Sequence, residues 1–126
     1  MNKYYAKKTT VDGIEFDSKA ESARYSELVM LQKAGVIRNL ERQVRFELQP
    51  KFVTMEADTI KPIVYVADFV YEQQTNFSLI DKTSIDFWVK IIEDRKGFRT
   101  KEFLLKKKML LYKIAKGEIV GKFIET

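Results

Sequence analysis

The stretch Ile91-Ile92-Glu93-Asp94-Arg95-Lys96-Gly97 begins apolar and continues with two acidic and then two basic residues. Residues 88–96 are rich in Ile, Val and Trp, which predicts a strand. Because side chains alternate between the faces of a strand, Asp94 and Lys96 should share one surface, with Glu93 on the other. A carboxylate can bind a hard cation and an ammonium can stabilise an oxygen. The pair therefore indicates a site, although an ordinary exposed edge pair would give the same pattern.

Asp68 stands out in the same way. It lies inside an otherwise uncharged run, and residues 63–72 predict a second strand. Aspartate is disfavoured there unless solvent, a partner or a metal accounts for it. The polar interval 73–83 predicts a hairpin tip, which would place Asp68 beside Asp94. Two adjacent carboxylates repel each other, and a divalent cation is the usual remedy. A solvent-facing Asp68 is the simpler alternative.

Helices are predicted on either side of these strands. Ser18 to Ala34 should form the first, ended by Gly35, and Thr100 to Lys116 the second, ended by Gly117. The apolar stripe predicted for the first helix is Ala20, Ala23, Leu28, Leu31 and Ala34, and that for the second is Phe103, Leu104, Leu110, Leu111 and Ile114.

Shorter elements complete the expected fold. A turn at Asp12-Gly13 should join two short extended pieces, and residues 36–48 and 119–124 should be strands, with a polar loop at 51–61. The order predicts an α/β fold, a central mixed β-sheet flanked by helices, as a single domain over residues 1–126.

Two further groups of residues admit a structural and a functional interpretation. Ser18 and Glu21 have the spacing of a helix capping box, in which Glu21 only reaches back to the helix start. Basic residues follow the Lys96 strand and could form either a solvated face or a phosphate-binding surface. They are Arg99, Lys101, Lys106, Lys107, Lys108 and Lys113.

Composition limits the chemistry. The 126 residues include no cysteine and no histidine, which excludes zinc-thiolate sites, disulfides and histidine general bases. Hydrolysis would have to use carboxylates, lysine, arginine, tyrosine or a metal with oxygen ligands. The net charge of +5 favours a polyanionic partner. No secretory signal or membrane-spanning run is recognisable, so a cytoplasmic protein without a membrane partner is expected.

Three segments, taken in order, resemble the PD-(D/E)XK nuclease superfamily, which includes restriction enzymes and phage and archaeal Holliday-junction resolvases. More closely, they resemble the short phage-encoded proteins of domain of unknown function 1064. The matching stretches are Gly13 to Glu21, Tyr65 to Tyr71, and Glu93 to Gly97 with Thr100 and Phe103 beyond. Ala67 stands where the superfamily's nominal proline would be. The resemblance implies a restriction-endonuclease-like core.

The resemblance also implies roles. Asp68 and Asp94 would be metal ligands together with the main-chain carbonyl of Arg95, and Glu21 would complete the acidic cluster. Lys96 would position the attacking water or stabilise charge on the phosphate. The metal would be Mg²⁺, for which Mn²⁺ can substitute. A local bulge would make Glu93 the ligand in place of Asp94.

The expected function is therefore a magnesium-dependent endodeoxyribonuclease that selects branched DNA, of the Holliday-junction-resolvase type, in phage recombination or DNA processing. Two symmetric incisions require a homodimer with two-fold symmetry. The alternatives are a non-catalytic nucleic-acid-binding module, in which the acidic cluster is incidental, and a nuclease that acts on flapped, nicked or single-stranded DNA.

Overall fold

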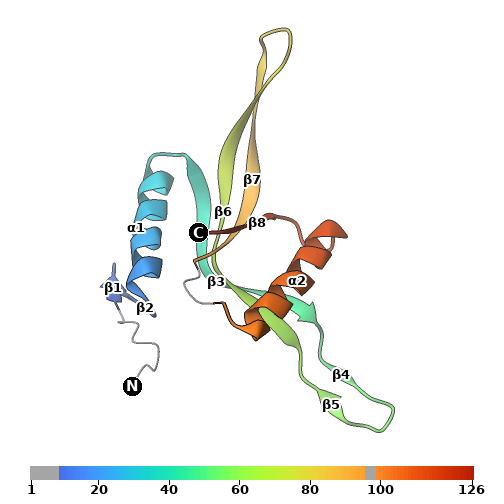
Figure 1. The fold of residues 1–126 in the computed structure, drawn as a ribbon. Coiled ribbons are helices and arrows are strands. Elements are labelled where there is room, and N and C mark those ends of the chain that lie inside the picture. The colour runs from blue at the N-terminus through green and yellow to red at the C-terminus, as the bar shows by residue number, and fades with distance from the viewer. Residues whose placement is uncertain (1–8, 96–98) are drawn as a thin grey trace. The chain divides into compact units, whose positions relative to one another are not determined.

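The computed structural model describes residues 9–95 and 99–126, and it shows an α/β protein with two helices and a mixed four-stranded sheet (Figure 1). The sheet has the order β3-β6-β7-β8, with β3 at Ile37–Gln49, β6 at Ile63–Ser78, β7 at Ser84–Asp94 and β8 at Lys122–Glu125. Strands β7 and β8 pair in parallel, with Asp94 opposite Glu125. The predicted α/β class with a mixed sheet and two helices is confirmed. Neither helix in the described ranges has the length and apolar character needed to cross a membrane.

The chain divides into two compact units. Unit 1 comprises Met1–Leu40 and Tyr71–Val89, and unit 2 comprises Glu41–Val70 and Lys90–Thr126. Strands β3, β6 and β7 each run through both units. The single domain expected over residues 1–126 stays a prediction.

Unit 1 begins with a small hairpin, in which β1 (Thr9–Val11) pairs with β2 (Ile14–Phe16). The turn predicted at Asp12-Gly13 is confirmed, since both residues have positive φ, 51° and 76°. Helix α1 (Lys19–Lys33) follows, with the hydroxyl of Ser18 as its N-cap. The ring of Phe16 packs at 5.1 Å from that of Tyr25 on this helix.

The stripe predicted for α1 is confirmed at Leu28, which is buried, and wrong at its alanines. Ala20, Ala23 and Ala34 are exposed, whereas the buried residues of the helix are Glu21, Ser22 and Leu28. Alanine methyl groups bring little apolar area, so they do not fix which face of a helix turns inward. Leu28, a member of the predicted stripe, is fully buried and fixes the orientation.

Unit 2 holds a contiguous apolar core beneath α2 (Lys101–Ala115). Its buried members are Leu48, Tyr65, Ala67, Val70, Ile92 and Leu110. Leu110 is the helix's buried contribution, and the partly buried Phe103 and Ile114 pack beside it. Leu104 and Leu111, which were also predicted to face inward, are exposed. The contact is a narrow seam of residues three to four positions apart, and these two leucines lie outside it.

Two strand boundaries also differ from the predictions. Strand β6 continues to Ser78, so the hairpin tip is residues 79–83 rather than 73–83. The predicted loop at 51–61 contains a short hairpin of β4 (Phe52–Val53) and β5 (Thr59–Ile60), with Phe52 opposite Ile60. Polar residues occur on exposed strands as well as in loops. The backbone N–H and C=O groups of β4 and β5 pair with each other, so this hairpin needs no buried apolar face.

Candidate functional site

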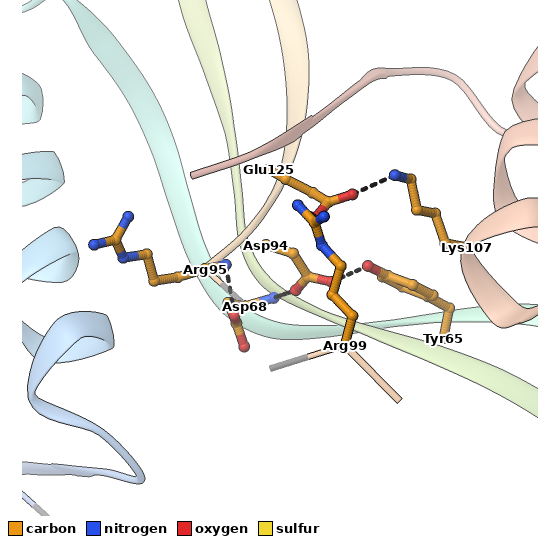
Figure 2. A network of polar contacts seen from close by, with 7 residues as sticks. All are labelled: Tyr65, Asp68, Asp94, Arg95, Arg99, Lys107 and Glu125. Atoms are coloured by element: carbon orange, nitrogen blue, oxygen red, sulfur yellow. Dashed lines mark hydrogen bonds and ion pairs between the residues drawn. The ribbon is translucent and has the colours of Figure 1, made fainter. Parts of the chain in front are cut away.

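Asp68 on β6 and Asp94 on β7 lie side by side in unit 2 and are both buried, with 7% and 0% of their surface exposed. The main-chain N–H of Asp68 donates to Oδ1 of Asp94 at 3.0 Å, and the main-chain N–H of Arg95 donates to Oδ2 of Asp68 at 2.9 Å (Figure 2). Each carboxylate thus accepts from the main chain of the other strand. The structure brings these two predicted site residues together.

The remaining carboxylate oxygens accept from side chains. Oδ2 of Asp94 accepts from the hydroxyl of Tyr65, and Oδ1 of Asp68 accepts from the amide of Gln43 at 3.4 Å. Figure 2 shows the Asp94 carboxylate turned toward Tyr65 and the Asp68 carboxylate toward the main chain of Arg95. Buried carboxylates are costly unless hydrogen-bonded, and here each of the four oxygens has a donor.

Asp94 borders a hollow of about 220 Å³ in unit 2. The lining includes Tyr65 from β6, and Thr100, Phe103 and Lys106 from the start of α2. The rings of Phe103 and Phe123 pack at 6.2 and 6.1 Å from that of Tyr65 and so fix its position. A helix N-terminus and a lysine both favour an anion here. Glu102 also lines the hollow and pairs with Lys106 at 3.0 Å, so the hollow combines a buried carboxylate with a helix N-terminus and a partly neutralised lysine.

Other acidic residues lie on the neighbouring strand positions. Glu93 is fully buried and accepts from the hydroxyl of Thr126 at 3.1 Å, while Thr126 N–H donates to the main-chain oxygen of Asp94 at 2.9 Å. Glu125 pairs with Arg99 at 2.7 Å and with Lys107, as Figure 2 shows. The hydrogen bond from Lys107 is the main reason that the pKa of Glu125 lies below its usual range. Of these acidic residues, Asp94 is the one whose carboxylate accepts a hydrogen bond from the main chain of Asp68.

The basic residues predicted to bind phosphate are largely engaged with carboxylates. Besides Arg99 and Lys107, Lys106 pairs with Glu102 at 3.0 Å. Lys113 pairs with Glu118 at 2.8 Å. Lys101 and Lys108 are exposed. Their side of α2 is thus partly neutralised within the protein, and the phosphate-binding surface stays a prediction.

Glu21 belongs to unit 1, not to the unit that contains Asp68 and Asp94. It is 7% exposed, and its main-chain N–H donates to the hydroxyl of Ser18 at 3.1 Å, which is half of the predicted capping box. The predicted Lys96 lies outside the described residues. Within residues 9–95 and 99–126, no group of three or more His, Cys, Asp or Glu side chains is arranged to hold a metal ion. What the structure assembles is the Asp68–Asp94 pair.

Comparison with known protein families matches residues 1–124 to the family described as "Protein of unknown function (DUF1064)". The chain belongs to this family. No curated protein matches the chain, and no solved structure does. Membership of DUF1064 assigns no activity, so the function has to be argued from the chemistry of the site.

Three residues around the acidic pair of this DUF1064 chain were missed by sequence reasoning: Tyr65, Gln43 and Glu125. Tyr65 lies three positions before Asp68, a spacing that does not suggest contact within a strand. Gln43 has a positive φ of 51°, a conformation that glutamine does not signal. Glu125 reaches the site through the parallel pairing of β8, which is a tertiary feature.

Proposed function

We propose that this protein is a metal-dependent DNA endonuclease of the PD-(D/E)XK type that acts on branched DNA. The observation that carries the proposal is the pairing of two buried aspartates on neighbouring strands: the Asp94 carboxylate accepts from the main-chain N–H of Asp68, and the Asp68 carboxylate accepts from the main-chain N–H of Arg95, the residue after Asp94. The same two residues are the ligands that the family resemblance implies. A basic composition and the anion-favouring groups around Asp94 support a phosphodiester substrate.

The donor types at the site suit magnesium, because the available ligands are oxygens without histidine or cysteine. Asp68 and Asp94 would hold the ion together with the main-chain carbonyl of Arg95, and Mn²⁺ would substitute. For this, the hydrogen bonds that Asp94 accepts from the Tyr65 hydroxyl and Asp68 from the Gln43 amide would have to give way. When bound, the metal would neutralise charge on the phosphate and acidify a water molecule.

The chain's own residues have distinct parts in this mechanism. Asp94 is held in place by the main chain of Asp68, and Tyr65 competes for its second oxygen. Lys106 and the first turn of α2 would orient the phosphate in the hollow beside Asp94. Lys96 would stabilise the charge that develops during attack, as the resemblance implies. Glu21, which belongs to unit 1, is assigned by the resemblance alone.

The choice of branched DNA carries a structural requirement. A four-way junction is resolved by two symmetric incisions, so two copies of the chain related by a two-fold axis would act together. Flapped, nicked and single-stranded DNA are the substrates against which this preference has to be measured.

The test is a cleavage assay on a four-way junction, a flap, a nicked duplex, a linear duplex and a single strand, with magnesium, manganese or chelator. Asp68→Asn and Asp94→Asn should each lower cleavage by roughly 100-fold or more, because the ligand charge is lost. The matched control is Asp86→Asn, an exposed aspartate of β7 that pairs with Asn76 at 2.7 Å, and it should cleave normally. Full cleavage by Asp68→Asn would overturn the assignment.

A non-catalytic nucleic-acid-binding module is the second candidate. It is favoured by the hydrogen bonds that already engage each oxygen of Asp68 and Asp94. In that case the wild-type protein binds branched DNA but cleaves none of the five substrates with either metal. Binding measured in parallel by gel shift separates this outcome from a failure to recognise DNA.

A further inference from the structure

A second hollow, of about 660 Å³, lies entirely within unit 1 and takes no part in the site of Asp68 and Asp94. Its volume falls in the range of small-molecule sites, about 300–1,000 Å³. The lining comes from the end of α1, the start of β3 and the unit 1 part of β7. The residues that matter are Gln32, Arg38, Asn39 and Trp88.

The guanidinium of Arg38 lies over the ring of Trp88 in this hollow. Its guanidinium carbon lies 4.1 Å from the ring centre of Trp88, and its Nη2 donates to Oε2 of Glu72 at 3.1 Å. The indole and the carboxylate together hold the guanidinium in place, while 49% of the arginine side chain remains exposed. The hollow therefore presents a planar cation stacked on an indole, at the surface and already oriented.

The backbone beneath this platform is also fixed. Asn39 has a positive φ of 56°, which is uncommon for a non-glycine residue, and its side-chain amide donates to the other oxygen of Glu72 at 2.5 Å. The next residue, Leu40, donates its main-chain N–H to the side chain of Gln32 at 2.9 Å. Side chains from β6 and α1 thus hold a strained segment of β3 in one conformation, as expected of a preorganised binding site.

From this arrangement we propose that the Arg38–Trp88 hollow binds an unpaired nucleobase of a nucleic acid. Bases stack on aromatic rings and on arginine planes, and such stacking is tolerant of sequence because every base has a flat face. The inference rests on the proposed function only in taking DNA as the partner. It adds that the protein also binds an unpaired base, such as that of a flap or of an opened branch point, through residues that take no part in the acidic pair.

The neighbouring carboxylate distinguishes a base from a phosphate. Glu72 offsets the charge of Arg38, so a free phosphate gains little from this arginine. Stacking does not depend on net charge in the same way. A nucleic acid that lacks its bases should therefore bind poorly here although it keeps all of its phosphates.

The chain's single tryptophan, Trp88, provides the readout. The full-length protein is titrated with a short oligothymidine, with an abasic strand of the same length and with inorganic phosphate, all in chelator so that no cleavage occurs. Oligothymidine should quench the fluorescence and bind at least about 10-fold more tightly than the abasic strand, since stacking contributes roughly 1–3 kcal/mol per base. Inorganic phosphate should leave the fluorescence unchanged.

Arg38→Lys keeps the charge but removes the planar group, and it should weaken oligothymidine binding about 5-fold or more. Arg24→Lys is the matched control, because Arg24 is also an arginine of unit 1 in an ion pair with a glutamate, Glu27, and it should bind as the wild type does. Equal binding of the abasic strand, or unchanged binding by Arg38→Lys, overturns the proposal. Cleavage is measured separately, so quenching without cleavage removes the proposed function alone, and cleavage without quenching removes this inference alone.

Discussion

Helices α1 and α2 are built on the same plan but bury different kinds of residue. Each has fifteen residues, an N-cap hydroxyl that accepts from the main chain three residues on, and a glycine of positive φ directly after its C-cap. Helix α2 buries Leu110 in the core of unit 2. Helix α1 buries Glu21 and Ser22 along with Leu28. Capping signals therefore decide where these helices begin and end, but not which face turns inward.

The first turns of the two helices sharpen the contrast. Each carries one acidic residue, Glu21 in α1 and Glu102 in α2. Both positions would benefit equally from the positive end of the helix dipole. Glu102 remains exposed and pairs with Lys106, whereas Glu21 is buried. A carboxylate at the surface already gains from the helix dipole, as Glu102 does. The dipole alone therefore does not explain why Glu21 is buried.

The largest effect is expected from the buried leucine of α2. Leu110→Ala should lower the free energy of unfolding by about 2–5 kcal/mol, because it opens a cavity in a core where the side chain is fully buried. Its neighbour Leu111, 41% exposed, gives the matched variant Leu111→Ala, for which about 1 kcal/mol or less is expected. Urea unfolding followed by circular dichroism measures both. Equal losses would mean that the face of α2 has been misassigned.

The next effect concerns the two first-turn carboxylates. If Glu21 belongs to the nuclease site, Glu21→Gln should lower junction cleavage by roughly 100-fold, equivalent to about 2.7 kcal/mol of barrier. Glu102→Gln, the same change in the first turn of α2, should alter cleavage far less, because Glu102 lines the hollow and pairs with Lys106 but is not a proposed metal ligand. Gln can also serve in a capping box at position 21, and Glu102 is exposed, so both variants should keep close to wild-type stability. Normal cleavage by Glu21→Gln would return this residue to a purely structural role.

Much of the architecture was predictable from local patterns. The helix ends followed from Ser18, Thr100, Gly35 and Gly117, and the strand at β3 followed from apolar residues that alternate with charged ones. These signals act through hydrogen bonds and side-chain periodicity within a few residues, so they survive without knowledge of the fold. The juxtaposition of Asp68 and Asp94 was also inferred, from a hairpin between two apolar strands.

What escaped prediction depends on partners distant in the chain. Tyr65 binds Asp94 across 29 positions, and Glu125 reaches Asp94 through a parallel strand pair. The buried face of α1 was predicted only at Leu28, because its alanines carry the periodicity but little area, while Glu21 and Ser22 carry none of the apolar pattern. The ion pairs of Lys106 and Lys107 were missed for the same reason, since a charge pattern shows the cations and not the carboxylates that meet them.

The smallest effect concerns the ion pairs of the two helices. They differ in whether the partner lies on the same helix or on a strand. Arg24 of α1 pairs with Glu27 of the same helix, whereas Lys107 of α2 pairs with Glu125 on β8. Lys107 is the first cause of the lowered pKa of Glu125. A carboxyl whose pKa is lower in the folded than in the unfolded state adds stability above its unfolded pKa, about 4.3 for glutamate. That contribution is lost as the pH falls through the lower, folded-state pKa.

Lys107→Gln should therefore flatten the fall in stability between about pH 5 and pH 3, because the pKa of Glu125 moves back toward its unfolded value. Lys101→Gln removes the same charge from an exposed position of α2, and its pH dependence should match that of the wild type. Urea midpoints taken at half-unit steps of pH compare the three proteins. The difference is expected to be small, because Arg99 also pairs with Glu125 and continues to favour its charged form. Parallel curves for all three proteins would show that the Lys107–Glu125 pair adds no measurable stability. The two helices would then differ only in the residues that they bury.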